Sequence, residues 1–378
     1  MPHPDTTLNA LHTRLQPLRR AALCKRQLTL SDIRPLLRDL GAQPIGESYE
    51  GRPIERISMG HGPLIILAWT QMHGDESTAT AAVLDWLQLL RDAADGEQAA
   101  AIGLPANWQE LVALQVIPML NPDGAERGTR ENAQGIDINR DALAQQSPEG
   151  RLLWQQVQSL RPSVAFNLHD QNPYYTVGAS SEPATIAFLA PAYHPDKHVD
   201  SARLQAKQLI AHMRKVLAHW LPNGIARYND SYSARSFGDQ IAGTGASTIL
   251  IESGAHRDDP ERQVARELNV LALHAALQAL LNEQAREYTL ADYYAIPENR
   301  SDGLCDIKIH QLTFVPQGRE AFQADVCILH KGADYVVDFV GDASNTAGFV
   351  EVAGHGKKYP ATVHKGGDAR ALLDFLNH

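Results

Sequence analysis

Residues 64–90, LIILAWTQMHGDESTATAAVLDWLQLL, decide the fold class. The apolar run at 64–69 is typical of a buried strand, and the apolar spacing after Ser77 is typical of a helix. The polar turn between them, residues 71–76, carries one histidine and two acidic side chains. A strand that passes through a short turn into a helix is the unit from which α/β sheets are built.

Three further apolar runs repeat the strand signal, at 111–120, 164–169 and 247–253. Segments with helical spacing, such as 201–220 and 261–287, separate or follow them. Short apolar strands that alternate with helices favour a sheet covered by helices on both faces. We therefore predict an α/β fold around a central sheet.

The two ends of the chain differ from this middle part. Residues 1–43 favour a helical lead-in, with Ser31 as the expected N-cap of its last helix and Gly41 just beyond its end. After about residue 290, apolar residues alternate with polar ones, as in IKIHQLTF and DYVVDFVGD, which is the period of strands. We predict one domain over 1–288 and a small, mainly β domain over 289–378.

The composition is that of an ordinary globular protein. Among the 378 residues, 34 Lys and Arg face 44 Asp and Glu, a formal net charge of −10. A negative field attracts neither nucleic-acid phosphates nor anionic lipids, so we expect no nucleic-acid and no membrane partner. Three scattered cysteines and no recognisable secretion signal favour a reduced, cytoplasmic protein. The oligomeric state is not indicated.

The turn after the first apolar run offers two metal ligands, His73 and Glu76, three residues apart. A catalytic zinc commonly takes two histidines and one carboxylate and keeps one position open for water. His169, at the end of 164–169, is the best candidate for the missing ligand. Ligands that leave neighbouring parallel strands at their carboxyl ends would converge in one crevice.

A second motif segment, residues 121–140, reads NPDGAERGTRENAQGIDINR. Five features follow one another in order along the chain: HxxE, NPDG, an arginine before DxNR, a later histidine on a strand, and a glutamate on the last core strand. The pattern, which runs from His73 to Glu252, resembles the zinc carboxypeptidases of the M14 family. This resemblance implies a mixed, largely parallel central sheet flanked by helices, and Zn²⁺ as cofactor.

The same resemblance implies roles for individual residues. His73, Glu76 and His169 would bind the zinc, and Glu252 would be the general base. Arg130 would stabilise the oxyanion, a role for which Arg127 is the nearby alternative.

Further residues would hold the substrate and the metal ligands. Asn139 and Arg140 would grip the free carboxylate of the substrate, for which a guanidinium is suited. Asp137 would accept a hydrogen bond from the free nitrogen of His73 and thereby fix its tautomer. Tyr232 would close over the bound terminus, with Tyr228 as its competitor.

Other features have simpler interpretations. By the same resemblance, Gly238 would give the side-chain pocket no charge preference. Arg235 in the pocket would favour an acidic side chain, but a solvated loop arginine is the favoured interpretation. His194 and His198 stand four residues apart, which on a helix would face one metal, but Pro195 between them favours a loop and so argues against a second metal site. Residues 354–358, GHGKK, favour a β-turn over a phosphate-binding loop.

These residues favour a zinc-dependent carboxypeptidase that hydrolyses the C-terminal amide bond of peptides or peptide-like substrates with a free carboxylate. One alternative is an amidohydrolase of the aspartoacylase and succinylglutamate desuccinylase group, which acts on N-acyl amino acids and often carries a β appendage. A second alternative is a silent module that binds carboxylate termini. The preferred terminal residue, the choice between peptide and murein substrates, and the role of the β domain are left open by the sequence.

Overall fold

The computed structural model describes residues 12–14 and 19–377. The chain forms two compact units. The first runs to Gln171 and again over Ala184–Glu298, and the second consists of Asn172–Pro183 and the residues from Asn299 on. The second unit therefore includes twelve residues that lie, in the sequence, between the two parts of the first unit.

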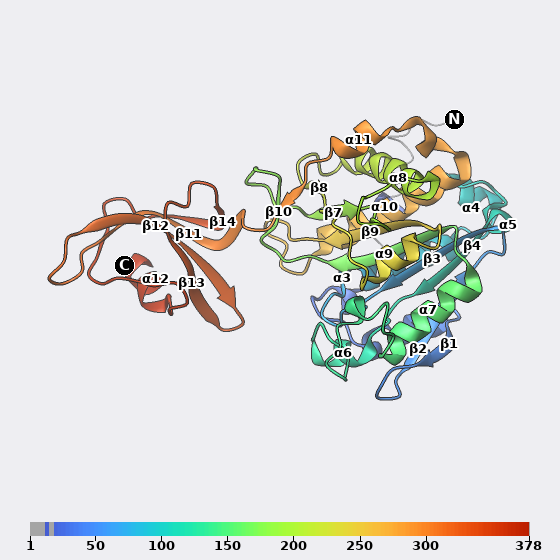
Figure 1. The fold of residues 1–378 in the computed structure, drawn as a ribbon, viewed down its shortest axis with the longest axis horizontal. Helices are drawn as coiled ribbons and strands as arrows, with labels where there is room; N and C mark the ends of the chain where they lie inside the picture. The colour runs from blue at the N-terminus through green and yellow to red at the C-terminus, as the bar shows by residue number, and fades with distance from the viewer. Residues whose placement is uncertain (1–11, 15–18, 378) are drawn as a thin grey trace. The chain divides into compact units, whose positions relative to one another are not determined.

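The first unit contains an eight-stranded sheet in the order β1-β2-β4-β3-β5-β9-β7-β8 (Figure 1). Its strands are β1 (Gln43–Glu47), β2 (Pro53–Met59), β3 (Leu64–Thr70), β4 (Val112–Ile117), β5 (Val164–Asp170), β7 (Ile186–Leu189), β8 (Ile225–Arg227) and β9 (Ser247–Ser253). The neighbours β4, β3, β5 and β9 are parallel, whereas β2 pairs antiparallel with both β1 and β4, and β7 pairs antiparallel with β9. The predicted α/β fold with a mixed, largely parallel sheet is confirmed.

Helices cover this sheet on both faces. They are α2 (Leu30–Asp39), α3 (Thr78–Asp92), α4 (Gly96–Ala101), α5 (Trp108–Leu111), α6 (Pro122–Arg127), α7 (Pro148–Leu160), α8 (Ser201–Leu217), α9 (Phe237–Ala242), α10 (Gln263–Asn282) and α11 (Leu290–Tyr294), with 3-10 turns η2 (Ala21–Leu23), η3 (Ile138–Arg140) and η4 (Gln284–Glu287). Side chains of α2, α3, α8 and α10 belong to one core, and side chains of α7 and α9 to the other.

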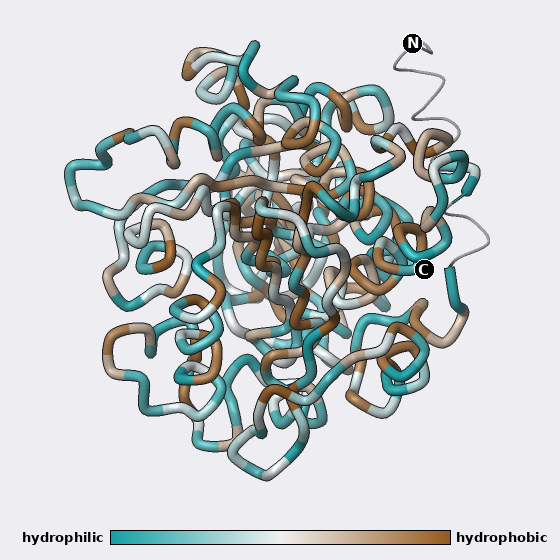
Figure 2. The backbone as a smooth tube through the Cα atoms, turned by 90° about the vertical axis from the view of Figure 1, so that its right-hand side faces the viewer, coloured by the Kyte–Doolittle hydropathy of each residue, from teal (hydrophilic) through white to brown (hydrophobic). Residues whose placement is uncertain are grey.

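Strand β3 shows why the apolar runs are continuous. Ile66 and Ala68 enter the core beneath α3 and α10, whereas Leu67 and Trp69 enter the core beneath α7. A strand covered on both faces needs apolar residues at every position. In Figure 2 the hydrophobic segments gather in the interior, where the sheet lies.

Helix α10 is long and apolar enough to cross a membrane by length and composition alone, but 72% of that segment is buried. Within the described residues it is a core helix, packed against α3 and α8. Its apolar character is explained by this packing.

The second unit is mainly β. Strands β11 (Leu304–Phe314), β12 (Phe322–Lys331), β13 (Asp334–Gly341) and β14 (Ala347–Ala353) form a sheet in the order β13-β12-β11-β14, with β15 (Lys358–Tyr359) beside β11. A short ladder joins β10 (Asn299–Arg300) to β6 (Thr176–Val177), which explains why residues 172–183 belong here. The helix α12 (Arg370–Asn377) packs on the sheet through Leu372 and Leu376.

Local details correct one prediction and agree with another. Helix α2 begins after Thr29, not Ser31, because the Asp32 carboxylate accepts hydrogen bonds from the backbone N–H and the hydroxyl of Thr29, at 2.8 and 2.9 Å. Much of the predicted lead-in before it lies outside the described residues. At 354–358 the backbone N–H of Lys357 donates to the carbonyl of Gly354, as a turn requires.

Candidate metal centre

Three parallel strands bring the predicted site residues to one edge of the sheet. His73 follows β3, His169 is the second-last residue of β5, and Glu252 is the second-last residue of β9. His169 and Glu252 are directly paired across β5 and β9. Residues more than 80 positions apart in the chain thus become neighbours, because the carboxyl ends of parallel strands meet at the same edge.

His73, Glu76 and His169 converge on one point. His73 Nδ1 lies 2.7 Å from Glu76 Oε1, and His169 Nδ1 lies 2.7 Å from Glu76 Oε2. One donor atom from each residue lies within 4.8 Å of the others. The three side chains are buried, with exposed fractions of 2%, 9% and 2%. The structure therefore brings two imidazoles and one carboxylate together at a buried point, largely shielded from solvent.

The turn that carries His73 and Glu76 is fixed by the NPDG segment. An added Cβ on Gly74 would lie 2.0 Å from the carbonyl carbon of Gly124, so the two backbones touch where only glycine fits. Asn121 caps α6 by accepting from the N–H of Gly124 and donates from its own side chain to the carbonyl of Met72. NPDG thus positions the metal-ligating turn.

Asp137 and Arg130 surround this group. His73 Nε2 lies 3.1 Å from Asp137 Oδ1, and Arg130 Nε donates to the other carboxylate oxygen at 3.0 Å. Arg130 Nη1 also lies 3.1 Å from His73 Nδ1 and donates to Glu76 Oε1 at 3.3 Å. Arg127, the alternative, instead pairs with Glu50 and donates to the carbonyl of Asp123. Of the two predicted arginines, Arg130 is the one that contacts the group.

The charges of the three residues depend on one another. Burial opposes the ionised form of Glu76, but His169 and His73 outweigh it and hold the pKa of this carboxyl well below its usual range. Burial also opposes the charged form of His73, yet Glu76 and Asp137 raise its pKa to about 9. For His169, burial prevails and lowers the pKa. A buried carboxylate that attracts positive charge from two imidazoles is a site prepared for a cation.

Glu252 lies beside this group without a hydrogen-bond partner at one oxygen. Its Oε2 is buried and makes no hydrogen bond. Burial, and then the negative charge of Glu76, raise the pKa of Glu252 well above its ordinary value. A carboxyl without a fixed partner, next to a cation site, is able to accept and return a proton.

Sequence reasoning missed Arg262, a buried residue at the N-cap of α10. Its guanidinium donates to the carbonyl of Ser253 at 2.7 Å and to the carbonyl of Gln171 at 2.8 Å. It also lies 3.5 Å from the carboxylate of Asp170. Arg262 therefore joins the ends of β5 and β9, directly after His169 and Glu252. No motif marks it, because its partners are backbone carbonyls.

Asn139 and Arg140 lie on η3 and contact the segment that leads into α9. Asn139 Oδ1 accepts from the backbone N–H of Phe237 at 3.1 Å, and Arg140 Nη1 lies 3.3 Å from the hydroxyl of Ser236. Arg140 is exposed, so its remaining donors are accessible. Tyr232 is half-buried in the same segment, but none of the hydrogen bonds or ion pairs given for the described residues joins it to the metal-ligating group.

The donor set fits zinc. Catalytic zinc sites commonly use three protein ligands of the His and Glu types, supported by a carboxylate that contacts the second nitrogen of a ligating histidine. His73, Glu76 and His169 provide the ligands, and Asp137 provides the support. The unpartnered oxygen of Glu252 lies beside this ligand set.

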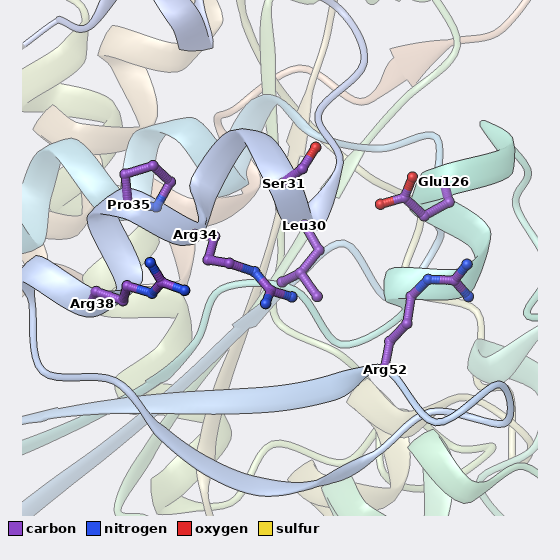
Figure 3. A pocket seen from close by; sticks show the side chains of 7 residues that line it. All are labelled: Leu30, Ser31, Arg34, Pro35, Arg38, Arg52 and Glu126. Atoms are coloured by element: carbon purple, nitrogen blue, oxygen red, sulfur yellow. The ribbon is translucent and has the colours of Figure 1, made fainter.

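A surface pocket of about 320 Å³ lies elsewhere on the first unit. Figure 3 shows Arg34 and Arg38 on α2, with Arg52 and Glu126 on facing segments. None of its lining residues belongs to the metal-ligating group. The convergent chemistry of the molecule is therefore not in this pocket.

Comparisons with known proteins agree with these observations. Residues 41–205 match the family model of zinc carboxypeptidases, peptidase family M14. The fold is similar to a metallo-carboxypeptidase from Burkholderia cenocepacia, with 17% identity, a TM-score of 0.52 and coverage of 69% of this chain and 70% of the other. It is also similar to carboxypeptidase A from Helicoverpa armigera, with 15% identity, a TM-score of 0.51 and coverage of 75% and 79%. A search of curated proteins finds no match. The resemblance to the M14 family is confirmed.

Proposed function

We propose that this metallopeptidase of the zinc carboxypeptidase family hydrolyses the last amide bond of peptides or peptide-like substrates that end in a free carboxylate. The observation that carries this proposal is the convergence of His73, Glu76 and His169 next to an unpartnered Glu252 oxygen. The arginine and asparagine of η3, at the border of the same region, supply the recognition of the carboxylate.

His73, Glu76 and His169 would hold Zn²⁺. The ion, when bound, would polarise the scissile carbonyl and lower the pKa of water at its open position. Glu252 takes the proton from the attacking water and returns it to the leaving amine. Asp137 holds His73 in the tautomer whose Nδ1 faces the ion, because it accepts from Nε2.

Arg130 and Arg140 act on different parts of the substrate. Arg130 already reaches the metal-ligating atoms, so its guanidinium is placed to donate to the oxygen that becomes negative in the tetrahedral intermediate. Arg140 offers a planar pair of donors to the terminal carboxylate, and Asn139 supports it. Tyr232 remains our candidate for a side chain that covers the bound terminus.

The second, β unit supports one alternative, an N-acyl amino acid amidohydrolase of the aspartoacylase and succinylglutamate desuccinylase type. Such enzymes use the same ligands and base, so metal content does not separate the two functions. The released product does: a carboxypeptidase liberates the terminal amino acid of a peptide, whereas the alternative liberates an acyl acid from an N-acyl amino acid.

The test is the product profile of the zinc-loaded protein with three substrates: a peptide with a free C-terminus, the same peptide amidated, and an N-acyl amino acid. We expect the first to be cleaved fastest. Arg140→Ala should chiefly lose activity on this substrate. Arg151→Ala is the control and should keep this activity, because Arg151 donates to the backbone carbonyls of Gln145 and Gln146. Equal cleavage of the amidated peptide would overturn the exopeptidase proposal, and cleavage of only the N-acyl amino acid would select the alternative.

A further inference from the structure

The loop between β7 and α8 carries a second group of metal-ligating side chains. Its sequence, His194-Pro195-Asp196-Lys197-His198, forms no helix, but the turn still brings the two imidazoles together. Their rings stack with centroids 4.6 Å apart and planes 8° apart. Donor atoms of His194, Asp196 and His198 all lie within 4.8 Å of one another. Pro195 therefore excludes a helix without excluding a site.

The distances from the Asp196 carboxylate to the two imidazoles suit one small cation. Asp196 Oδ2 lies 3.5 Å from His194 Nδ1 and 3.7 Å from His198 Nε2. Ligands at about 2.0–2.1 Å from a tetrahedral zinc stand about 3.4 Å from one another. The His194 Nδ1 lone pair now accepts the backbone N–H of Asp196 at 3.1 Å, a weak turn contact that an ion would replace. The contacts of Asp196 with both imidazoles are therefore already close to the spacing of a ligand set.

A buried arginine holds the loop in this shape. Arg203 is 3% exposed and donates to the carbonyls of Lys197 and His198, at 2.7 and 3.1 Å. It also donates to the carbonyl of Ala190 at the other end of the loop. Since the backbone beneath the ligands is fixed from both ends, binding of an ion costs little ordering entropy.

The nearby positive charges are matched by a different carboxylate. Lys197 Nζ donates to Asp230 Oδ1 at 2.8 Å, and Arg203 Nη2 donates to Asp230 Oδ2 at 2.8 Å. Neither cation is paired with Asp196. The Asp196 carboxylate therefore contacts only the two imidazoles among the described ion pairs.

We propose that His194, Asp196 and His198 bind a second divalent transition-metal ion of the Zn²⁺, Cu²⁺ or Ni²⁺ class. Imidazole nitrogens select these ions over Mg²⁺ and Ca²⁺, which prefer oxygen ligands. All three residues are exposed, so water fills the remaining coordination positions and the ion is held less tightly than at the buried group. This site is independent of the proposed peptidase activity.

The test counts zinc ions on the untagged, full-length chain, by equilibrium dialysis against zinc alone. We expect two zinc ions per chain, one tight and one weaker. The double substitution His194→Gln and His198→Gln should remove the weaker one and keep the tight one. His61→Gln, which changes an exposed histidine elsewhere on the first unit, should keep both. One zinc in the parent protein, or two in the double variant, would overturn the proposal.

Electron paramagnetic resonance with Cu²⁺ gives a second readout that does not depend on activity. In a His73→Asn, His169→Asn background, checked for folding by its thermal transition, one Cu²⁺ should show coupling to two imidazole nitrogens. Adding His194→Gln and His198→Gln should abolish this signal. A signal that survives all four substitutions would contradict the assignment, and so would its absence from the folded background protein.

Discussion

Two groups of two histidines and one carboxylate occupy the first unit, and they are built in opposite ways. His73, Glu76 and His169 come from the ends of two strands and are buried. The group of His194, Asp196 and His198 comes from five consecutive residues and is exposed.

Burial changes what a set of metal ligands can do. At Glu76 and His73 of the buried group, mutual attraction outweighs burial: it holds the pKa of Glu76 well below its usual range and raises that of His73 to about 9. A neighbouring strand supplies Glu252. At the exposed loop, water screens the charges and the described contacts supply no comparable base. Only the buried group has the surroundings of a catalytic centre, although both have the ligands of a metal site.

The largest expected effect separates the two groups directly. His169→Asn should reduce peptide hydrolysis to the level of the metal-free protein and remove the tight zinc, because two ligands do not hold a catalytic ion. His198→Asn is the matched change at the exposed loop and should leave hydrolysis within about twofold, since no reacting group is altered. The check is activity together with metal content. Equal losses of hydrolysis in both variants would show that the two groups do not differ in this way.

Next in size is the role of the neighbouring strand. Glu252→Gln should retain the tight zinc and lower kcat by roughly 10² to 10⁴, the contribution of a general base. Glu261→Gln, an exposed acid in the turn that precedes α10, serves as the control and should be unchanged. Undiminished turnover after Glu252→Gln would remove the base assignment and leave the metal ligands standing.

The third prediction concerns the buried arginines beside the two groups, Arg262 and Arg203. Arg262→Leu should lower the free energy of unfolding by about 1–3 kcal/mol for each of the two backbone carbonyls that lose a buried donor. Asp170 keeps its ion pair with Arg26. Arg262→Leu should also reduce kcat, whereas Arg262→Lys should recover part of the stability.

Arg203→Leu is the matched change beneath the exposed loop. It should weaken the second zinc and spare kcat of the zinc-loaded enzyme. Urea unfolding, zinc dialysis and kinetics distinguish the two supports. If Arg203→Leu impaired turnover as strongly as Arg262→Leu, the two regions would not be independent.

The smallest expected effect separates the influence of burial on a histidine pKa from the influence of a neighbouring carboxylate. His274 of α10 is fully buried, and burial lowers its pKa to about 4, whereas the similarly buried His73 has Glu76 and a pKa raised to about 9. Unfolded histidine titrates near 6.5, so between about pH 6.5 and 4 the unfolded chain binds the extra proton. His274 should therefore reduce stability as the pH falls through this window, by up to about 3 kcal/mol.

Urea unfolding between pH 4 and 7 measures this loss. His274→Gln retains a side-chain donor for the carbonyl of Ile102, the partner of His274 Nε2, but does not titrate. The difference in free energy of unfolding between the parent protein and His274→Gln should therefore narrow as the pH falls. A difference that stays constant over this range would show that burial alone does not set the pKa of His274.

Much of the fold follows from local pattern. The run predicted at 247–253 is strand β9 itself. The run at 111–120 contains β4, and the run at 164–169 contains all of β5 except its last residue. A strand covered on both faces leaves a continuous apolar run, which is a strong signal. The N-cap predicted at Ser31 is two residues too late, because Thr29 and Asp32 form the capping box.

The candidate ligands are also visible in the sequence, since His73, Glu76 and His169 each follow or end an apolar run. Spacing favours Arg130 over Arg127 without excluding either. In the structure Arg130 contacts Glu76 whereas Arg127 pairs with Glu50, and the oxyanion role of Arg130 stays a prediction. At the exposed group, the sequence argues against a second metal site because Pro195 excludes a helix, yet side chains four residues apart also meet across a turn.

Periodicity and residue type are local properties, so the sequence alone predicts strands β3, β4, β5 and β9, the main helices around them and the kinds of side chain available for chemistry, but not the short strands β7 and β8. Which of these side chains meet is a property of the folded chain. The pairing of β5 with β9 sets His169 beside Glu252, the contact of Gly74 with Gly124 aims the metal-ligating turn, and Arg262 joins two strand ends. These depend on the register of distant strands and on bonds to backbone carbonyls, which every residue possesses and no motif records.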